Sequence, residues 1–440
     1  MWDQLPELIL TLIFDHLECR DRFSVDRTCQ SWRRALAAPV LWRSITIFID
    51  RDLRSDSSPT KQLAGKYGQY IRKLELAWSR PYILPSETRA TWNIRAKEGV
   101  EFIAIIKKKA VQLKQFVLTD WFFGSNWNHR SKLLYAVAHF LRCQRNLTSL
   151  SLLNANLGVS DVLRLFRAVS WSCGDSLEYL DIRGAFKDWQ APHSNSRYLQ
   201  YLERLHTLTT FKLDYPALSD LALNSLALAA PKVLRELHIS VRDSDARQHT
   251  IQDAAWHNLV AVCPQLTVSY TIGDEKVNLN KTIAVNISHY EDISYLLVPS
   301  VPLSRFHMYG GHVWDQSRSR NFRTTIGLLI SYYSKSLSEV MLQLRNNREQ
   351  LDDLLVSLVE RCRRLTNFQY NGIIRSVGTL QEILNLQIDN KTSFRTIHVK
   401  PSTVNLRNRG ALDEINYNYN HRMLDRGIDF RIDGPALSFC

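Results

Sequence analysis

Membrane spans and disulfide frameworks are both missing from this sequence. No apolar stretch approaches the roughly 18 residues that a transmembrane helix needs, and the first residues do not form a secretory signal. The seven cysteines are odd in number and widely spaced, and no CxxC pair occurs. These absences argue against a membrane protein and against a secreted scaffold. They predict a soluble protein of the cytosol, the nucleus or both, where thiols stay reduced.

Motifs of catalysis and cofactor binding are absent as well. The sequence contains no HExxH, GxSxG, Walker A or GxGxxG pattern, and its thirteen histidines show no metal-ligand spacing. We therefore predict no catalytic residues, no metal site and no cofactor. The chain is expected to act as a binding protein and not as an enzyme.

The composition is that of an ordinary globular protein with an excess of positive charge. Hydrophobic residues make up 45% of the 440 residues, charged residues make up 22%, and the formal net charge is +13. Such a charge favours acidic partners and keeps nucleic-acid binding as a rival function, which would require basic residues clustered on one face. We interpret the basic runs as solvated helix faces; they are Lys107, Lys108 and Lys109 with Lys114, and Arg361, Arg363 and Arg364.

The N-terminal segment predicts three short helices. Residues 5–17 read LPELILTLIFDHL, with apolar residues at the spacing of a helix face. Asp21 is a suitable N-cap for a second helix, a third covers 30–36, and Pro39 ends it. A unit of this size cannot bury all the apolar surface it carries, so part of that surface is left for a partner. The alternative is an amphipathic helix that merely begins a helical domain.

The motifs LPxxLIxxIFxxL, DRxxxxxxC, WR and PxLWR in residues 5–43 resemble the F-box at nearly every position. Asp26 and Thr28 depart slightly from the pattern. The resemblance implies docking onto the Skp1-type adaptor of an SCF (Skp1–cullin–F-box) ubiquitin ligase and, through it, onto a cullin. It puts Leu5, Pro6, Ile9 and Phe14 in contact with the adaptor, and it puts Trp32, Leu41 and Trp42 at the packed three-helix junction and its edge. The residues that match adaptor-binding positions are Leu5, Pro6, Leu8, Ile9, Ile13, Phe14, Leu17, Arg22, Cys29, Trp32, Leu41 and Trp42.

A short strand-like phrase, two apolar residues flanking one residue of any kind, recurs through the rest of the chain at intervals near 30 residues. Segments between the phrases have helical apolar spacing, for example 158–171 and 351–363. We therefore predict an α/β fold in which the F-box precedes a leucine-rich-repeat-like solenoid with parallel strands. A generic α/β domain with parallel strands is the alternative. The phrases start at residues 74, 116, 150, 180, 211, 237, 306, 340, 368 and 397, with a weaker one at 266.

Four regions follow from these patterns. We assign residues 1–48 to the F-box, 49–68 to a polar connecting loop, 69–434 to the solenoid and 435–440 to a C-terminal tail. Within the solenoid, residues 297–307 and 362–365 resemble F-box only proteins 33 and 39.

Side chains at the middle of each phrase are expected to face away from the core, on the surface that repeat proteins use for binding. The aromatic and basic loops at 119–130 and 307–323 suit an acidic or phosphorylated protein segment, although such aromatics also pack under loops. The expected function is substrate recognition for an SCF ligase; the alternative is a scaffold without a role in degradation. The candidate substrate-binding residues are Glu75, Asp181, Arg183, Lys212, His238, Arg305, His307, Tyr309, Gln369, His398 and Lys400.

Overall fold

The computed structural model divides the chain into two compact units. The first comprises residues 1–217 with 225–234, and the second comprises 218–224 with 235–440. The boundary falls within helix α10 (Asp220–Ala229). The structure describes residues 4–54, 58–79, 89–121, 130–187, 191–241, 249–273, 293–309, 322–344, 346, 349–401 and 406–433.

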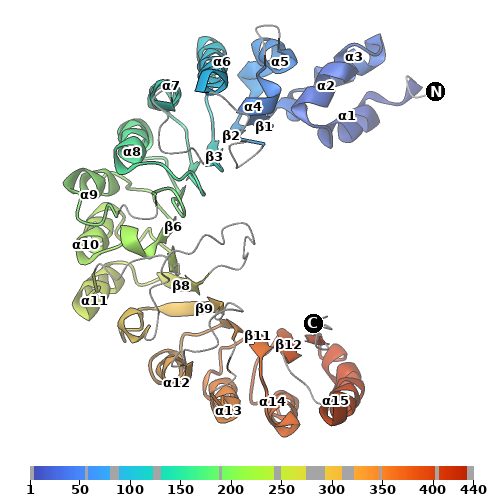
Figure 1. Cartoon of the computed structure of the whole chain (residues 1–440), viewed down its shortest axis with the longest axis vertical. Coiled ribbons are helices and arrows are strands. Elements are labelled where there is room, and N and C mark those ends of the chain that lie inside the picture. The colour runs from blue at the N-terminus through green and yellow to red at the C-terminus, as the bar shows by residue number, and fades with distance from the viewer. Residues whose placement is uncertain are drawn as a thin grey trace. The chain divides into compact units, whose positions relative to one another are not determined.

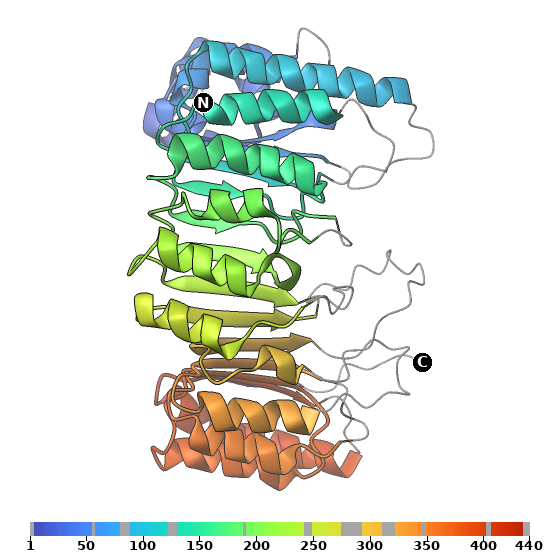
Figure 2. The same cartoon turned by 90° about the vertical axis from the view of Figure 1, so that its left-hand side faces the viewer.

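The first unit begins with three helices and continues as a parallel sheet whose strands lie in chain order. Helices α6 to α9 lie on one side of these strands (Figure 1) and side by side in the turned view (Figure 2). The strands are β1 (Ser44–Phe48), β2 (Lys73–Ala77), β3 (Gln115–Thr119), β4 (Ser149–Ser151), β5 (Tyr179–Asp181) and β6 (Thr210–Asp214). The helices are α1 (Glu7–Asp15), α2 (Cys19–Asp26), α3 (Gln30–Leu36), η2 (Pro39–Trp42), α4 (Ile49–Asp52), α5 (Pro59–Tyr67), η3 (Gly68–Tyr70), α6 (Arg89–Lys108), α7 (Arg130–Arg142), α8 (Val159–Cys173), α9 (Ser196–Leu202) and η4 (Tyr215–Ala217).

The second unit repeats the same arrangement of parallel strands in chain order, with a helix between successive strands. Its strands are β7 (Glu236–Val241), β8 (Thr267–Ile272), β9 (Leu303–Tyr309), β10 (Glu339–Gln343), β11 (Asn367–Gly372), β12 (Thr396–Pro401) and β13 (Asp429–Ile432). Its helices are α11 (Asp253–Val262), η5 (Ser294–Leu296), α12 (Phe322–Tyr333), α13 (Asp352–Arg361), α14 (Val377–Ile388) and α15 (Leu406–Leu424).

The core of each unit lies between the strands and the helices. In β7, for example, Leu237, Ile239 and Val241 are buried, whereas the residues between them are half-buried. In α8 the buried side chains, Leu165, Phe166 and others, recur at helical spacing. One strand and one helix cannot bury these apolar faces alone, so each repeat depends on its neighbours. The predicted α/β fold with a leucine-rich-repeat-like parallel sheet is confirmed.

Each of the ten stronger phrases falls on a strand, β2 to β7 and β9 to β12, although the phrases at 150–152 and 180–182 extend one residue past β4 and β5; the weaker phrase overlaps the start of β8. Two strands were missed. Strand β1 was assigned to the F-box, and β13 lies in a C-terminal segment without a clear phrase. The residues at 49–68 are not the loop that the polar composition predicted, because they contain α4 and α5. Pro59 occupies the first turn of α5, and Leu63 and Tyr67 are buried there.

A buried carboxylate holds helices α13 and α14 together. Asp352, which is 5% exposed, accepts hydrogen bonds from the backbone N–H groups of Arg375 and Ser376 at 3.1 and 2.8 Å. It also accepts one from the hydroxyl of Thr379 at 3.0 Å. These donors lie at the start of α14, where no preceding turn can satisfy them.

We expect Asp352→Ala to lower the free energy of unfolding by about 3 kcal/mol, because it leaves buried donors without an acceptor. The measurement is urea unfolding followed by circular dichroism. Asp353→Ala is the matched control, since the Asp353 carboxylate is exposed and pairs with exposed Arg323 at 2.7 Å. That pair is exposed and screened by solvent, so its loss should change the free energy of unfolding little. Equal effects of the two substitutions would contradict the role assigned to Asp352.

Candidate functional site

An exposed apolar surface covers one side of helix α1. Leu8, Ile9, Leu12 and Ile13 are 70%, 42%, 57% and 40% exposed, whereas Leu10 and Phe14 are buried. The apolar stripe read from the sequence therefore faces solvent. Adjacent exposed leucine and isoleucine side chains on one helix indicate a surface that a partner covers. We refer to Leu8, Ile9, Leu12 and Ile13 as the α1 patch.

Other predicted adaptor-binding residues lie near the α1 patch or beneath it. Pro6 is exposed at the N-terminal end of α1, and Leu5, Leu17, Cys29 and Trp32 are half-buried. Two exposed apolar residues were absent from the predicted set. Leu12 belongs to the helical pattern that predicted α1. Val40, in the neighbouring η2, is 49% exposed.

Four residues of the predicted adaptor-binding set are buried, including Leu41 and Trp42, which the F-box resemblance already put at the three-helix junction and its edge. Phe14 packs edge-on against Trp32 with ring centroids 5.4 Å apart. Arg22 is buried and donates to the backbone oxygens of Leu17 and Leu41. Leu41 is also buried, as is Trp42. Their physical role is to hold the three helices in place, which corrects the expectation that Phe14 meets a partner directly.

The helical segment is fixed to the first repeat by contacts from α4 and α5. The rings of Trp42 and Tyr67 stack with centroids 4.5 Å apart and an interplanar angle of 12°. Arg51 pairs with Glu18 at 2.6 Å, and Lys66 pairs with Asp26 at 3.2 Å. Helices α4 and α5 thus connect α2 and η2 of the helical segment to the first repeat.

In the first unit the middle residues of the recurring phrases lie in one row across the sheet. Strand register aligns Glu75, Val117, Ser151, Asp181 and Lys212 in that order. Glu75 accepts hydrogen bonds from the hydroxyls of two neighbouring threonines, Thr46 at 3.0 Å and Thr119 at 3.2 Å.

Asp181 is not available to a ligand, because it is 1% exposed. Its carboxylate accepts from Nε and a terminal nitrogen of Arg183 at 3.0 and 2.7 Å, and from the Tyr179 hydroxyl at 3.3 Å. Burial, together with the negative charge of Asp181, raises the pKa of Tyr179 to about 12. Asp181 and Arg183 therefore form an internal pair. Lys212, whose ammonium lies 5.3 Å from the Tyr179 ring centroid, is the half-buried cation next to them.

In the second unit the predicted residues fall on two rows and not on one. An irregularity between Val268 and Ser269 shifts the register, so that Ser269 lies opposite both His238 and Arg305. The next row contains His307, Met341, Gln369 and His398. Tyr309 and Lys400 lie further along their strands, with Tyr309 donating to the Met341 sulfur at 3.0 Å.

Three histidines on this face lie next to carboxylates. Nε2 of His238 is 3.1 Å from Glu236, that of His307 is 2.8 Å from Glu339, and that of His398 is 3.0 Å from Asp429. Arg305 joins the first pair, lying 3.9 Å from Glu236. The face is thus a polar surface of mixed charge, with its histidines held at fixed positions.

The hydrogen bond from His307 holds the pKa of Glu339 below its usual value of 4.5. Because the unfolded chain binds this proton more tightly, the stabilisation is complete above pH 4.5 and is lost as pH falls through the lower folded pKa. We expect Glu339→Gln to flatten the fall in melting temperature between pH 5 and pH 3, about the range over which such a carboxylate titrates. Thermal unfolding at several pH values measures this. An unchanged pH profile would contradict the prediction.

Much of the two predicted recognition loops lies outside the described residues, namely 122–129 and 310–321. At the start of the first loop, Trp121 is fully buried and donates from its indole nitrogen to the Leu76 backbone oxygen at 2.8 Å. This aromatic residue belongs to the core, where its ring packs edge-on against Trp78 with centroids 6.4 Å apart.

Within the described ranges, no group of three or more histidine, cysteine, aspartate or glutamate side chains is arranged to hold a metal ion. The same residues include no helix that is both long and apolar enough to cross a bilayer. Five described cysteines, at positions 29, 143, 173, 263 and 362, carry free thiols.

Comparison with known proteins identifies the N-terminal segment. A family model described as F-box-like matches residues 2–47. F-box/LRR-repeat protein 8 of Bos taurus is 37% identical over 57 residues, which are 13% of this chain and 15% of that protein. The chain therefore carries an F-box-like domain, and the similarity to this relative covers a small part of either protein.

Proposed function

We propose that this chain is the substrate-recognition subunit of an SCF-type E3 ubiquitin ligase. The observation that carries the proposal is the α1 patch, which lies on the F-box-like domain and is exposed to solvent. In the proposed complex the α1 patch, with Pro6 and Val40, binds a Skp1-type adaptor and through it a cullin. Phe14, Arg22, Leu41 and Trp42 support this surface from inside.

The repeats support the second half of the role. Stacked strand–helix repeats offer a long row of fixed side chains, which suits binding of a protein partner. On this proposal the chain performs no chemistry; it holds a substrate close to a transferase carried by other subunits. The side chains proposed for substrate contact are the half-buried ones: Glu75, Lys212, His238, Arg305, His307, Tyr309, Gln369, His398 and Lys400.

Two finer assignments belong to the proposal. The segments at 297–307 and 362–365 favour the subgroup of F-box only proteins 33 and 39. Action within a ligase of this type places the chain in the cytosol, the nucleus or both.

The test compares cells that express the tagged wild-type chain with cells that express a chain carrying Leu8→Asp and Leu12→Asp. Both positions are exposed, so the fold should be retained. We expect the wild type to co-purify the adaptor and cullin, and the variant to retain substrates while losing both. Substrates should accumulate unmodified with the variant. Equal ubiquitylation of bound proteins in the two preparations would refute the role. If the wild type binds the adaptor but its other bound proteins match those of the variant in amount and in modification, the scaffold alternative is favoured.

A further inference from the structure

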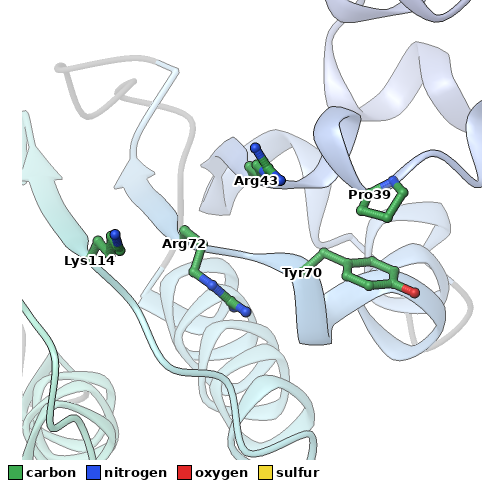
Figure 3. A pocket seen from close by; sticks show the side chains of 5 residues that line it. All are labelled: Pro39, Arg43, Tyr70, Arg72 and Lys114. Carbon is green, nitrogen blue, oxygen red and sulfur yellow. The ribbon is translucent and has the colours of Figure 1, made fainter.

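A basic groove lies where the F-box-like domain meets the first repeats. It has a volume of about 490 Å³ and is lined by Pro39, Arg43, Tyr70, Arg72 and Lys114 (Figure 3). Pro39 begins η2 and Tyr70 ends η3. The three cations come from the residues immediately before strands β1, β2 and β3.

Strand register brings the three cations into line. Ser44, Lys73 and Gln115 are paired across the sheet, so the residue before each of them occupies an equivalent position. Backbone hydrogen bonds continue this alignment: the Arg72 N–H donates to the Arg43 oxygen at 2.9 Å, and the Lys114 N–H donates to the Arg72 oxygen at 2.7 Å. Adjacent strands are about 4.8 Å apart, so the side chains leave the backbone at that interval.

Among the residues that the structure describes, none of the three cations forms an ion pair with a carboxylate, and all three are exposed. Nearby cations behave differently, since Lys61 pairs with Glu101 at 2.9 Å and Lys66 with Asp26. Like charges that line one pocket repel one another, and an anion bound among them would relieve that repulsion.

Arg72 is the best-positioned member of the groove. One of its terminal nitrogens donates to the backbone oxygens of Gln69 at 3.0 Å and Ile71 at 2.8 Å. This fixes the guanidinium without consuming its charge. The guanidinium of Arg43 and the ammonium of Lys114 can donate hydrogen bonds to a ligand. Tyr70 and Pro39 form an apolar wall of the groove.

We propose that this groove binds a phosphorylated serine or threonine side chain of a protein segment. A phosphate carries about −1.5 to −2 charges at pH 7 and accepts several hydrogen bonds, which matches two guanidinium groups and an ammonium. The groove is local and has three cations, whereas nucleic-acid binding rests on contacts to many phosphates along a backbone. That the segment belongs to a substrate rests on the proposed function; the anion binding itself does not.

The test measures fluorescence anisotropy of labelled peptide libraries with the full-length chain. One library contains a fixed phosphoserine, a second contains serine at that position, and a fluorescein-labelled single-stranded oligonucleotide is the third probe. The variant carries Arg43→Gln and Lys114→Gln, which leaves the structural hydrogen bonds of Arg72 intact. The matched control carries Arg363→Gln and Arg364→Gln, two exposed cations of the second unit with the same change in charge. A single Lys114→Gln chain serves if the double variant does not fold.

We expect the phosphoserine library to bind the wild type and the control equally, and to bind the variant about tenfold or more weakly, because charge-assisted hydrogen bonds are lost. The serine library should bind none of them well. The proposal is overturned if the phosphoserine library does not bind, if the control weakens binding as much as the variant, or if the oligonucleotide is the tighter ligand of the groove. Adaptor capture by the same preparations separates the two proposals: wild-type chain that fails to capture the adaptor refutes the proposed function and leaves the groove result standing.

Discussion

A chain carrying Pro6→Ala and Ile9→Ala should bind a Skp1-type adaptor about 1,000-fold more weakly than the wild type, while its melting temperature changes little. Central apolar anchors of an interface each cost about 2 kcal/mol or more when truncated, and 1.4 kcal/mol corresponds to about tenfold in affinity. Pro6 is exposed and Ile9 is 42% exposed, so neither side chain supports the core. Surface plasmon resonance with immobilised adaptor gives the affinity.

The matched control for this loss is a chain carrying Leu221→Ala and Leu228→Ala. These leucines of α10 are 54% and 73% exposed, so the control also removes two exposed apolar side chains, but outside the F-box-like domain. We expect its adaptor affinity to equal that of the wild type. If the two double variants bind equally well, the α1 patch is not the docking surface.

The strands were predictable because their signal is local. A pair of apolar residues flanking one polar residue, such as Leu237 and Ile239 around His238, shows directly in the chain. Strand β1 also alternates, with Ile45 and Ile47 buried, but these residues were assigned to the F-box and were not considered as a strand. Helix α5 was not predicted, because the polar composition of residues 49–68 indicated a loop. Its burial depends on Trp42, which stacks on Tyr67 and comes from a segment read as a separate domain.

The side-chain roles were less predictable, since burial depends on the third dimension. Helical spacing located the apolar residues of α1 but could not say that Phe14 points inward and Leu8 outward. The basic groove was missed for a similar reason. Lys114 was grouped with the lysines of α6, although it precedes β3; only strand register reveals that it lines up with Arg72.

Replacing Trp42 with alanine should have the largest effect on stability of any single change in the F-box-like domain. Trp42 is 2% exposed, donates from its indole nitrogen to the Leu36 oxygen at 2.7 Å, and stacks on Tyr67. The Arg22 guanidinium also lies 5.6 Å from its ring centroid. Truncating a buried tryptophan to alanine costs about 3–5 kcal/mol, because the transfer energy is lost and a cavity remains.

Hydrogen exchange monitored by mass spectrometry resolves where this loss falls. We expect amide protection to decrease in α1 to α3 and also in α5, since the Trp42 ring covers Tyr67, while protection in β7 to β13 is unchanged. Trp42→Phe should cost less, because an aromatic ring is kept and only the indole hydrogen bond and part of the buried volume are lost. Val40→Ala, at a position that is 49% exposed in the same η2, should leave protection as in the wild type. Retained protection of α5 in the Trp42→Ala chain would show that the F-box-like domain and the first repeat fold independently. Loss in both would show that they form one cooperative unit, in which the segment from 49 to 68 transmits the position of the docking helix to the repeats.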